Sequence, residues 1–181
     1  MPELERLAAQ IRRCKGCRLW KSRRHAVPGE GNPHARIMLI GQAPGKTEDA
    51  TGRPFVGRAG KLLTALLENN GIKRENVFIT SVIKCFPPKN RPPKRDEIAA
   101  CRPYLMQQIT LIKPKVIVLL GIVAAKAVLG NEERLEKIHG KKIIKNGITY
   151  IPTYHPAAAI RFPKIRKKLE MDFKNLIGGK E

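Results

Sequence analysis

Four short apolar runs punctuate the chain at residues 36–41, 77–83, 116–121 and 148–152. Each run is almost continuously hydrophobic, with no polar residue at every second position. Strands that are buried on both faces of a sheet have this composition, whereas half-exposed strands alternate polar and apolar residues. The pattern therefore predicts four interior strands.

Amphipathic stretches lie between and after these runs, and they predict helices. Residues 58–69 place Leu62, Leu63, Leu66 and Leu67 on one face and end before Gly71. Further helices are predicted at residues 96–112, 122–129 and 164–177. Strands that alternate with helices indicate an α/β fold with a parallel sheet, whose ligands bind beyond the carboxyl ends of the strands. No repeat or linker divides residues 1–181, so we expect a single domain.

The charge of the chain is strongly positive. Lys and Arg number 36 against 15 Asp and Glu, which gives a formal net charge of +21. The charged surface of a thermophilic protein is one explanation, but ion-pair networks need both signs and acids are scarce. A polyanionic partner, above all nucleic acid, explains the excess better. An anionic membrane surface is the alternative, although no apolar run approaches the ~20 residues of a membrane span and neither end carries a basic amphipathic anchor.

The positive residues are clustered. Residues 11–28 contain seven basic side chains and no acid, and a second group lies at residues 84–95. The third group follows His155 and is predicted to contact DNA: Arg161, Lys164, Arg166, Lys167 and Lys168. Aromatic residues make up only 5% of the chain, which disfavours a stacking platform for several bases of a single strand.

Four cysteines form two pairs, Cys14 with Cys17 and Cys85 with Cys101. The C-x2-C spacing of the first pair lets both sulfurs face one ion or cluster. Reduced core thiols or a disulfide are the alternatives, but without a signal peptide we expect a reducing cytoplasmic environment. Spacing alone does not separate zinc from an iron–sulfur cluster. The wide second pair favours a cluster that joins distant segments.

Glycine-rich loops follow the first strand. Gly41 and Gly45 permit a sharp loop whose backbone approaches a ligand closely, and Glu48 and Asp49 place carboxylates beside it. The loop is neither a Walker motif nor a dinucleotide-binding motif, and a simple strand-to-helix turn is the alternative. Phe55 follows, between Gly52-Arg-Pro and Val-Gly57, in a setting that suits stacking on a flat base better than core packing.

His155 stands directly after the last predicted strand, in Thr153-Tyr-His-Pro156, and a basic segment follows it. A histidine at the carboxyl end of a strand is a candidate site residue, with a packed or surface role as the alternative.

These motifs, in this order, resemble the family 4 uracil-DNA glycosylases of archaea and thermophilic bacteria. The resemblance rests on Gly41-Gln-Ala-Pro-Gly-x-x-Glu-Asp49, Gly52-Arg-Pro-Phe-Val-Gly57, the cysteine spacing and Tyr154-His-Pro156, and it runs from about Cys14 to the last helix. It implies a three-layer sandwich in which helices flank a four-stranded parallel sheet. It also implies a [4Fe–4S] cluster on the four cysteines, and removal of uracil from DNA to leave an abasic site.

The resemblance also assigns roles in the pocket. Phe55 stacks on the flipped base, and His155 faces the uracil O2 oxygen. Gly41 and Ala43 border the base, with Ser81 at its edge. Two positions depart from the family pattern: Gln42 replaces a Glu, and Ser81 replaces an Asn that reads the uracil edge. Gln42 can position a water but supplies no charge, and the Ser81 hydroxyl cannot make a two-point amide contact.

The function that follows is a monofunctional DNA glycosylase. Uracil leaves the duplex stack, residues 157–161 enter the groove as a loop, and His155 stabilises the departing pyrimidine. Glu48 or Asp49 supplies the carboxylate that Gln42 lacks. We expect a monomer that acts on damaged DNA in the nucleoid. The alternatives are a glycosylase for another deaminated base, such as hypoxanthine, and an iron–sulfur protein that binds damaged DNA without cleaving it.

Overall fold

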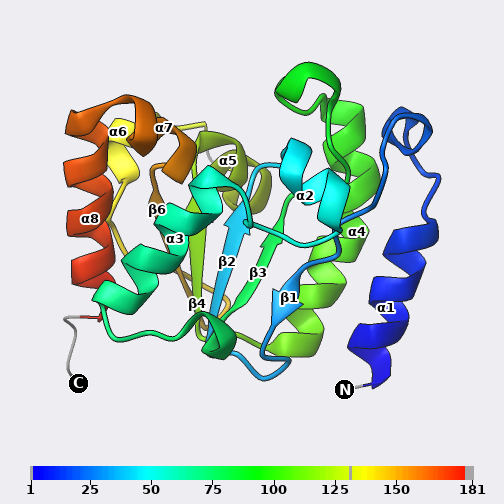
Figure 1. Cartoon of the computed structure of the whole chain (residues 1–181). Helices are drawn as coiled ribbons and strands as arrows, with labels where there is room; N and C mark the ends of the chain where they lie inside the picture. The colour runs from blue at the N-terminus through cyan, green and yellow to red at the C-terminus, as the bar shows by residue number, and fades with distance from the viewer. Residues whose placement is uncertain (1, 131, 178–181) are drawn as a thin grey trace.

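A mixed six-stranded sheet forms the centre of the computed structural model, which describes residues 2–130 and 132–177 (Figure 1). The strand order is β1-β3-β2-β4-β6-β5. The four central strands run parallel, and the short edge strands β1 and β5 pair antiparallel to their neighbours. The bounds are β1 (Glu30–Gly31), β2 (Ile37–Gly41), β3 (Phe78–Ser81), β4 (Val116–Leu120), β5 (Ile143–Lys145) and β6 (Ile148–Thr153).

The predicted parallel strands are thus confirmed as β2, β3, β4 and β6, but the predicted strand count of four was too low. β1 has two residues, too few for a hydrophobic pattern. β5 is largely exposed and forms a hairpin with β6 through Asn146 and Gly147, both at positive φ. Asn-Gly is a strong hairpin signal in a sequence, and it was overlooked.

Eight α-helices accompany the sheet in the described part of the chain. The helices predicted at 58–69 and 122–129 are confirmed as α3 (Arg58–Asn69) and α5 (Ile122–Leu129), and those predicted at 96–112 and 164–177 begin one residue earlier, as α4 (Arg95–Ile112) and α8 (Pro163–Ile177). Four were not predicted: α1 (Pro2–Arg13), α2 (Lys46–Thr51), α6 (Leu135–Ile138) and α7 (Pro156–Arg161). Three short 3-10 turns complete the set: η1 (Arg18–Lys21), η2 (Arg74–Asn76) and η3 (Pro88–Asn90).

Helix α7 corrects the expectation that residues 157–161 form a loop. His155 is the N-cap and accepts a hydrogen bond from the Ala157 backbone, while Pro156 occupies the first helical position. Proline is well suited to that position, and the three alanines that follow have the highest helix propensity. The segment is therefore a short helix and not a loop.

The helices form layers around the sheet. Helices α3, α7 and α8 pack against one another, and α1 packs along α4 (Figure 1). Central strand residues such as Leu39, Ile40, Ile117 and Leu119 are fully buried, as expected for strands covered on both faces. The predicted α/β sandwich class is confirmed, with a mixed sheet in place of a purely parallel one. Within the described residues, no helix combines the length and the apolar character needed to cross a lipid bilayer.

Candidate functional site

The carboxyl ends of β2 and β3 lie side by side, because Gly41 pairs with Ser81 in the sheet. Gly41 is needed there for steric reasons. A Cβ atom at this position would lie 2.6 Å from the Phe55 Cζ atom, so only glycine lets the ring rest over the strand end. The absence of one side chain therefore creates the space for the Phe55 ring beside Ser81.

The loop that carries Phe55 is held by a buried carboxylate. Glu48 Oε1 accepts hydrogen bonds from the backbone N–H groups of Val56 and Gly57, both at 2.8 Å, and Oε2 accepts one from Gly45 at 3.1 Å. Glu48 thereby joins the Gly41–Gly45 loop to the Gly52–Gly57 loop. Three backbone donors thus fix the orientation of its carboxylate.

Asp49 was predicted as an alternative to Glu48, and the structure places its side chain elsewhere. Its carboxylate accepts a hydrogen bond from the Arg24 backbone at 2.9 Å, while its backbone oxygen contacts the His25 ring at 2.8 Å. The side chain is buried and connects α2 to the segment that precedes β1. Of the two carboxylates, only Glu48 lines the cavity described next.

A cavity of about 120 Å³ opens beyond these strand ends. Phe55 and His155 lie together in its wall, with ring centroids 5.6 Å apart and planes tilted by 31°. The remaining lining comes from the two glycine loops, β3 and the neighbouring segments: Val27, Ala43, Pro44, Gly45, Glu48, Pro54, Ala59, Ser81, Asn90 and Ala157. The lining is largely apolar with a few polar groups, which is typical of a site for a small planar ligand.

A wider groove of about 340 Å³ adjoins the cavity and shares Ala43, Asn90, His155 and Ala157 with it. Gln42 lines the groove and not the inner cavity, together with Ala158, Arg161 and Phe162. The predicted site residues thus divide into two sets. Phe55, Ser81 and Glu48 belong to the inner cavity, Gln42 and Arg161 belong to the outer groove, and His155 faces both.

The imidazole of His155 is held in its neutral form. Nδ1 accepts the hydrogen bond from the Ala157 backbone at 3.1 Å, so in the neutral ring the hydrogen resides on Nε2. Burial lowers the pKa of His155 to about 4, although the negative charge of Glu48 acts in the opposite direction. At neutral pH the ring can therefore donate one hydrogen bond from Nε2 without carrying a positive charge.

The four cysteines come together from three separate segments. Cys14 and Cys17 lie between α1 and η1, Cys85 follows β3, and Cys101 is in α4; all four line one narrow cavity. An Arg18–Asp96 ion pair of 2.7 Å joins the first segment to the start of α4. None of the four is in a disulfide. Across residues 2–130 and 132–177, no three His, Cys, Asp or Glu side chains converge closely enough to hold a single metal ion.

The surroundings of the cysteines are apolar and basic. Ile11, Trp20 and Tyr104 line the same cavity. Burial raises the pKa of Cys101 to about 11 and also raises that of Cys85, whose sulfur accepts a hydrogen bond from Arg23 at 3.1 Å. Buried thiols of this kind become thiolates only when a cation or cluster compensates their charge.

Lys84 connects the cysteine cavity with the inner cavity. Its side chain is 1% exposed and lines the cysteine cavity, and burial lowers its pKa to about 7. Its ammonium group donates to Thr80 Oγ1 and to the Ser81 carbonyl oxygen, both at 2.7 Å, and to Gln108 Oε1 at 2.8 Å. The carboxyl end of β3 is therefore fixed by the amine of a buried lysine immediately before Cys85.

The predicted DNA-contacting residues lie next to the groove. Arg161 ends α7, and Lys164, Arg166, Lys167 and Lys168 are exposed in the first half of α8. Two of them also have partners within the chain. Arg166 pairs with Glu170 at 2.9 Å, and the Lys168 ammonium lies 5.6 Å from the centre of the Tyr154 ring.

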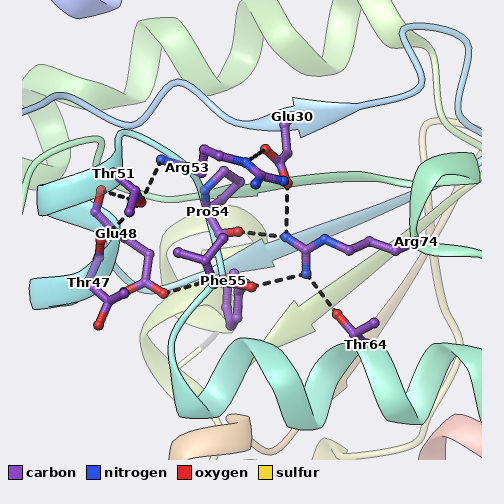
Figure 2. A network of polar contacts seen from close by, with 10 residues as sticks. Glu30, Thr47, Glu48, Thr51, Arg53, Pro54, Phe55, Thr64 and Arg74 are labelled. Carbon is purple, nitrogen blue, oxygen red and sulfur yellow. Dashed lines mark hydrogen bonds and ion pairs between the residues drawn. The ribbon is translucent and has the colours of Figure 1, made fainter.

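Sequence reasoning missed three residues near the site. Asn90 lines both the inner cavity and the outer groove. It belongs to the basic segment 86–95, in which Asn90 and Lys89 both have positive φ. Phe162 is 56% exposed at the groove, a setting that an isolated aromatic in a basic segment could have suggested. Arg74 holds the backbone of the Phe55 loop, and no local pattern marks it (Figure 2).

Comparison with known proteins places this site in a family. Residues 28–176 match the model of the uracil DNA glycosylase superfamily. The chain is similar to a type-4 uracil-DNA glycosylase of Sulfurisphaera tokodaii, at 49% identity over 97% of this chain and 84% of the relative. Type-4 enzymes of Saccharolobus solfataricus and Pyrobaculum aerophilum share 50% and 44% identity, over 97% and 98% of this chain and 86% and 94% of the relatives. With its cavity at the ends of β2 and β3 and its family motifs in order, the chain belongs to the type-4 uracil-DNA glycosylases.

Proposed function

We propose that the chain is a monofunctional DNA glycosylase that removes uracil from DNA and leaves an abasic site. The observation that carries this proposal is the cavity between Phe55, Ser81 and His155, in a chain of the type-4 family. A base inside a duplex cannot reach such a cavity, so the enzyme must rotate it out of the stack.

The inner cavity receives the base. The Phe55 ring offers an apolar face, and the Ser81 hydroxyl offers one donor and acceptor at the edge of the ring. His155 donates from Nε2 to a pyrimidine oxygen, where negative charge grows as the glycosidic bond breaks. A neutral donor suits this role because the hydrogen bond strengthens in the transition state and no proton has to be transferred.

The outer groove receives the sugar and the attacking water. Gln42 lines this groove, and its amide can orient water at the sugar carbon. Glu48 lines the inner cavity, and its negative charge stabilises the positive charge that develops on the sugar. Its oxygens already accept three backbone hydrogen bonds, which favours an electrostatic role over that of a proton acceptor.

The basic face of α7 and α8 holds the DNA backbone. Contacts to phosphates are independent of sequence and sensitive to salt. Phe162 is the exposed apolar side chain at the groove and the best candidate to fill the gap that the extruded base leaves. Phe162 thus takes the role of entering the DNA groove, which the sequence had led us to expect of residues 157–161. We expect the enzyme to act as a monomer in the nucleoid.

The cysteines hold a [4Fe–4S] cluster in this proposal, with zinc as the alternative. The donor set fits, because all four ligands are sulfur and line one apolar cavity. Arg23 donates a hydrogen bond to the Cys85 sulfur and provides positive charge beside it. The cluster would join α1, the segment after β3, and α4, and its role here is structural.

The test is excision from oligonucleotides that carry uracil, hypoxanthine, xanthine or a thymine mismatch, in duplex and single-stranded form. Alkali treatment after incubation converts abasic sites to strand breaks. We expect alkali-dependent breaks at uracil and no breaks without alkali, because a monofunctional enzyme leaves the strand intact. Breaks at hypoxanthine but not at uracil would replace uracil with another base. Tight binding without breaks at any base would identify a non-catalytic binder.

A further inference from the structure

We propose that Arg74 is a positioning residue for the reaction, because it holds Phe55 in the backbone conformation that places its ring in the base cavity. This inference rests on the stacking role of Phe55 in the proposed function. Arg74 does not line the base cavity itself. It lies in η2, before β3, and reaches the Phe55 loop from the outside (Figure 2).

The guanidinium group makes four contacts at once. Nη1 donates to the Phe55 carbonyl oxygen and to Thr64 Oγ1, both at 3.0 Å. Nη2 donates to the Pro54 carbonyl oxygen at 2.6 Å and to Glu30 Oε1 at 3.1 Å. Two successive carbonyl groups of the loop thus share one rigid, planar donor, which fixes the orientation of both peptide units.

The loop needs such a restraint because its backbone is strained at Phe55. Phe55 has φ of +49°, a left-handed conformation that is unfavourable for a residue other than glycine. The neighbouring helix leaves little space for an alternative. A Cβ atom on Gly60 of α3 would lie 1.9 Å from the Phe55 carbonyl oxygen, so the peptide is pressed against the helix backbone.

The ring itself is fixed by this conformation. Phe55 is 7% exposed, and its Cζ atom occupies the space where a side chain on Gly41 would be. A relaxed backbone at Phe55 would turn the ring away from the end of β2. The Arg74 hydrogen bonds therefore act on base binding through the ring and without contact to the base.

Glu30 keeps the guanidinium in place. Burial acts to raise the pKa of Glu30, but hydrogen bonds from Arg53 and Arg74 outweigh this effect and hold the pKa below its ordinary value. Its carboxylate therefore stays charged at neutral pH. The short strand β1 carries Glu30 and pairs with β3 at Ile79, which holds the carboxylate beside the Arg74 guanidinium.

Arg53 offers a matched control. Its guanidinium also pairs with Glu30, at 2.8 and 3.1 Å, but its side chain is 63% exposed and points to solvent. Like Arg74→Met, Arg53→Met removes one positive charge and one ion pair to Glu30. Unlike Arg74→Met, it leaves the hydrogen bonds from Arg74 to Pro54 and Phe55 intact. A difference between these two variants reports on the hydrogen bonds that only Arg74 makes, to the two loop carbonyls and to Thr64.

The experiment is a double-mutant cycle on single-turnover excision of uracil. Stacking of a base on an aromatic ring contributes about 1–3 kcal/mol, so we expect Arg74→Met to slow excision about 5- to 150-fold. In a Phe55→Ala background the same change should alter the rate less than about twofold, because no ring remains to be positioned. Arg74→Lys keeps the charge without the planar fork and should give an intermediate rate. If Arg74→Met does not fold, Arg74→Lys takes its place in the cycle.

A second measurement is independent of catalysis. The chain has five Phe residues, so incorporated 4-fluorophenylalanine gives few fluorine resonances, and Phe55→Ala identifies that of Phe55. We expect this resonance to shift in Arg74→Met and not in Arg53→Met. If the double variant slows excision by the product of the two single effects, Arg74 and Phe55 act independently and the positioning role is refuted. A Phe55 resonance that does not shift in Arg74→Met would refute it as well. An unmodified enzyme that never releases uracil would instead refute the proposed function, while the resonance would still decide the role of Arg74.

Discussion

The neutral imidazole of His155 makes a quantitative prediction about pH. If the pKa of His155 is about 4 in the folded protein, about nine tenths of the enzyme still carries a neutral ring at pH 5. With the ordinary value of 6.5, only about 3% would remain neutral at that pH. The two cases therefore differ about 30-fold in the active fraction at pH 5.

The assay is single-turnover excision of uracil at saturating enzyme, measured from pH 8 to pH 4. We expect the rate constant to stay nearly constant down to about pH 5 and then to fall as the pH approaches 4. The reason is that a second proton on the ring must displace the Ala157 backbone N–H from Nδ1 and must enter a partly buried site. Single-turnover conditions remove the effect of pH on product release.

His155→Gln is the matched control, because an amide can donate a hydrogen bond but does not titrate in this range. Its rate should be lower than that of the unmodified enzyme and should lack the decline that His155 causes. Any other titrating group would affect both proteins equally. A midpoint between pH 6 and 7 that disappears in His155→Gln would show that the ring titrates normally, and the argument from Nδ1 and burial would then be wrong.

His155 should also make the stability depend on pH. Because its pKa is lower in the folded chain than in the unfolded one, its contribution to the free energy of unfolding is highest above pH 6.5. It should decrease by at most about 3 kcal/mol as the pH falls from about 6.5 to about 4, and denaturant titration of His155→Gln should lack this part of the loss. Replacement of Arg166, Lys167 and Lys168 by Gln should weaken binding to all DNA sequences about equally. The slope of the logarithm of the binding constant against the logarithm of the salt concentration should fall by up to about 3, and by less if Arg166 stays paired with Glu170 and Lys168 with Tyr154 when DNA binds. An unchanged slope would show that these three residues do not contact DNA phosphates. Gln42→Glu should raise the excision rate on uracil about tenfold by adding negative charge near the sugar, and Ser81→Asn should sharpen the preference for uracil over hypoxanthine; lower uracil rates in both variants would indicate a site suited to another base. Cys85→Ala should abolish the visible absorbance of an iron–sulfur cluster and lower the melting temperature, whereas zinc without iron in anaerobically prepared protein would contradict the cluster.

The sequence identified the parts of the site that are local in the chain. Gly41 and His155 each stand in a short motif at a strand end, and parallel strands bring such ends to one edge of the sheet. Phe55 stands in a short glycine-bounded motif in the loop between α2 and α3. The sequence also indicated why position 41 is a glycine, namely that another group approaches the backbone closely there. The atom that makes the approach, Phe55 Cζ, could be found only in three dimensions.

The contacts that hold these motifs were beyond sequence reasoning. Arg74 and Glu30 are 44 residues apart and meet across the edge of the sheet. Glu48 and Asp49 are adjacent and chemically alike, yet one faces the cavity and the other a backbone amide of the N-terminal segment. In α2, successive side chains point in directions about 100° apart, and only the position of the helix in the fold decides which carboxylate reaches the cavity.

The segment from Thr80 to Cys85 connects the two chemical centres of the molecule. Ser81 borders the base cavity, and Cys85 borders the cysteine cavity only four residues later. Lys84 lies between them, and its ammonium group bonds the Ser81 carbonyl oxygen at 2.7 Å while its side chain lines the cysteine cavity. A shift of Cys85 must therefore move Ser81 or break the hydrogen bonds of a fully buried lysine, which is costly. For this reason the cysteine site helps to set the position of Ser81 in the wall of the inner cavity, although the cysteines lie outside that cavity.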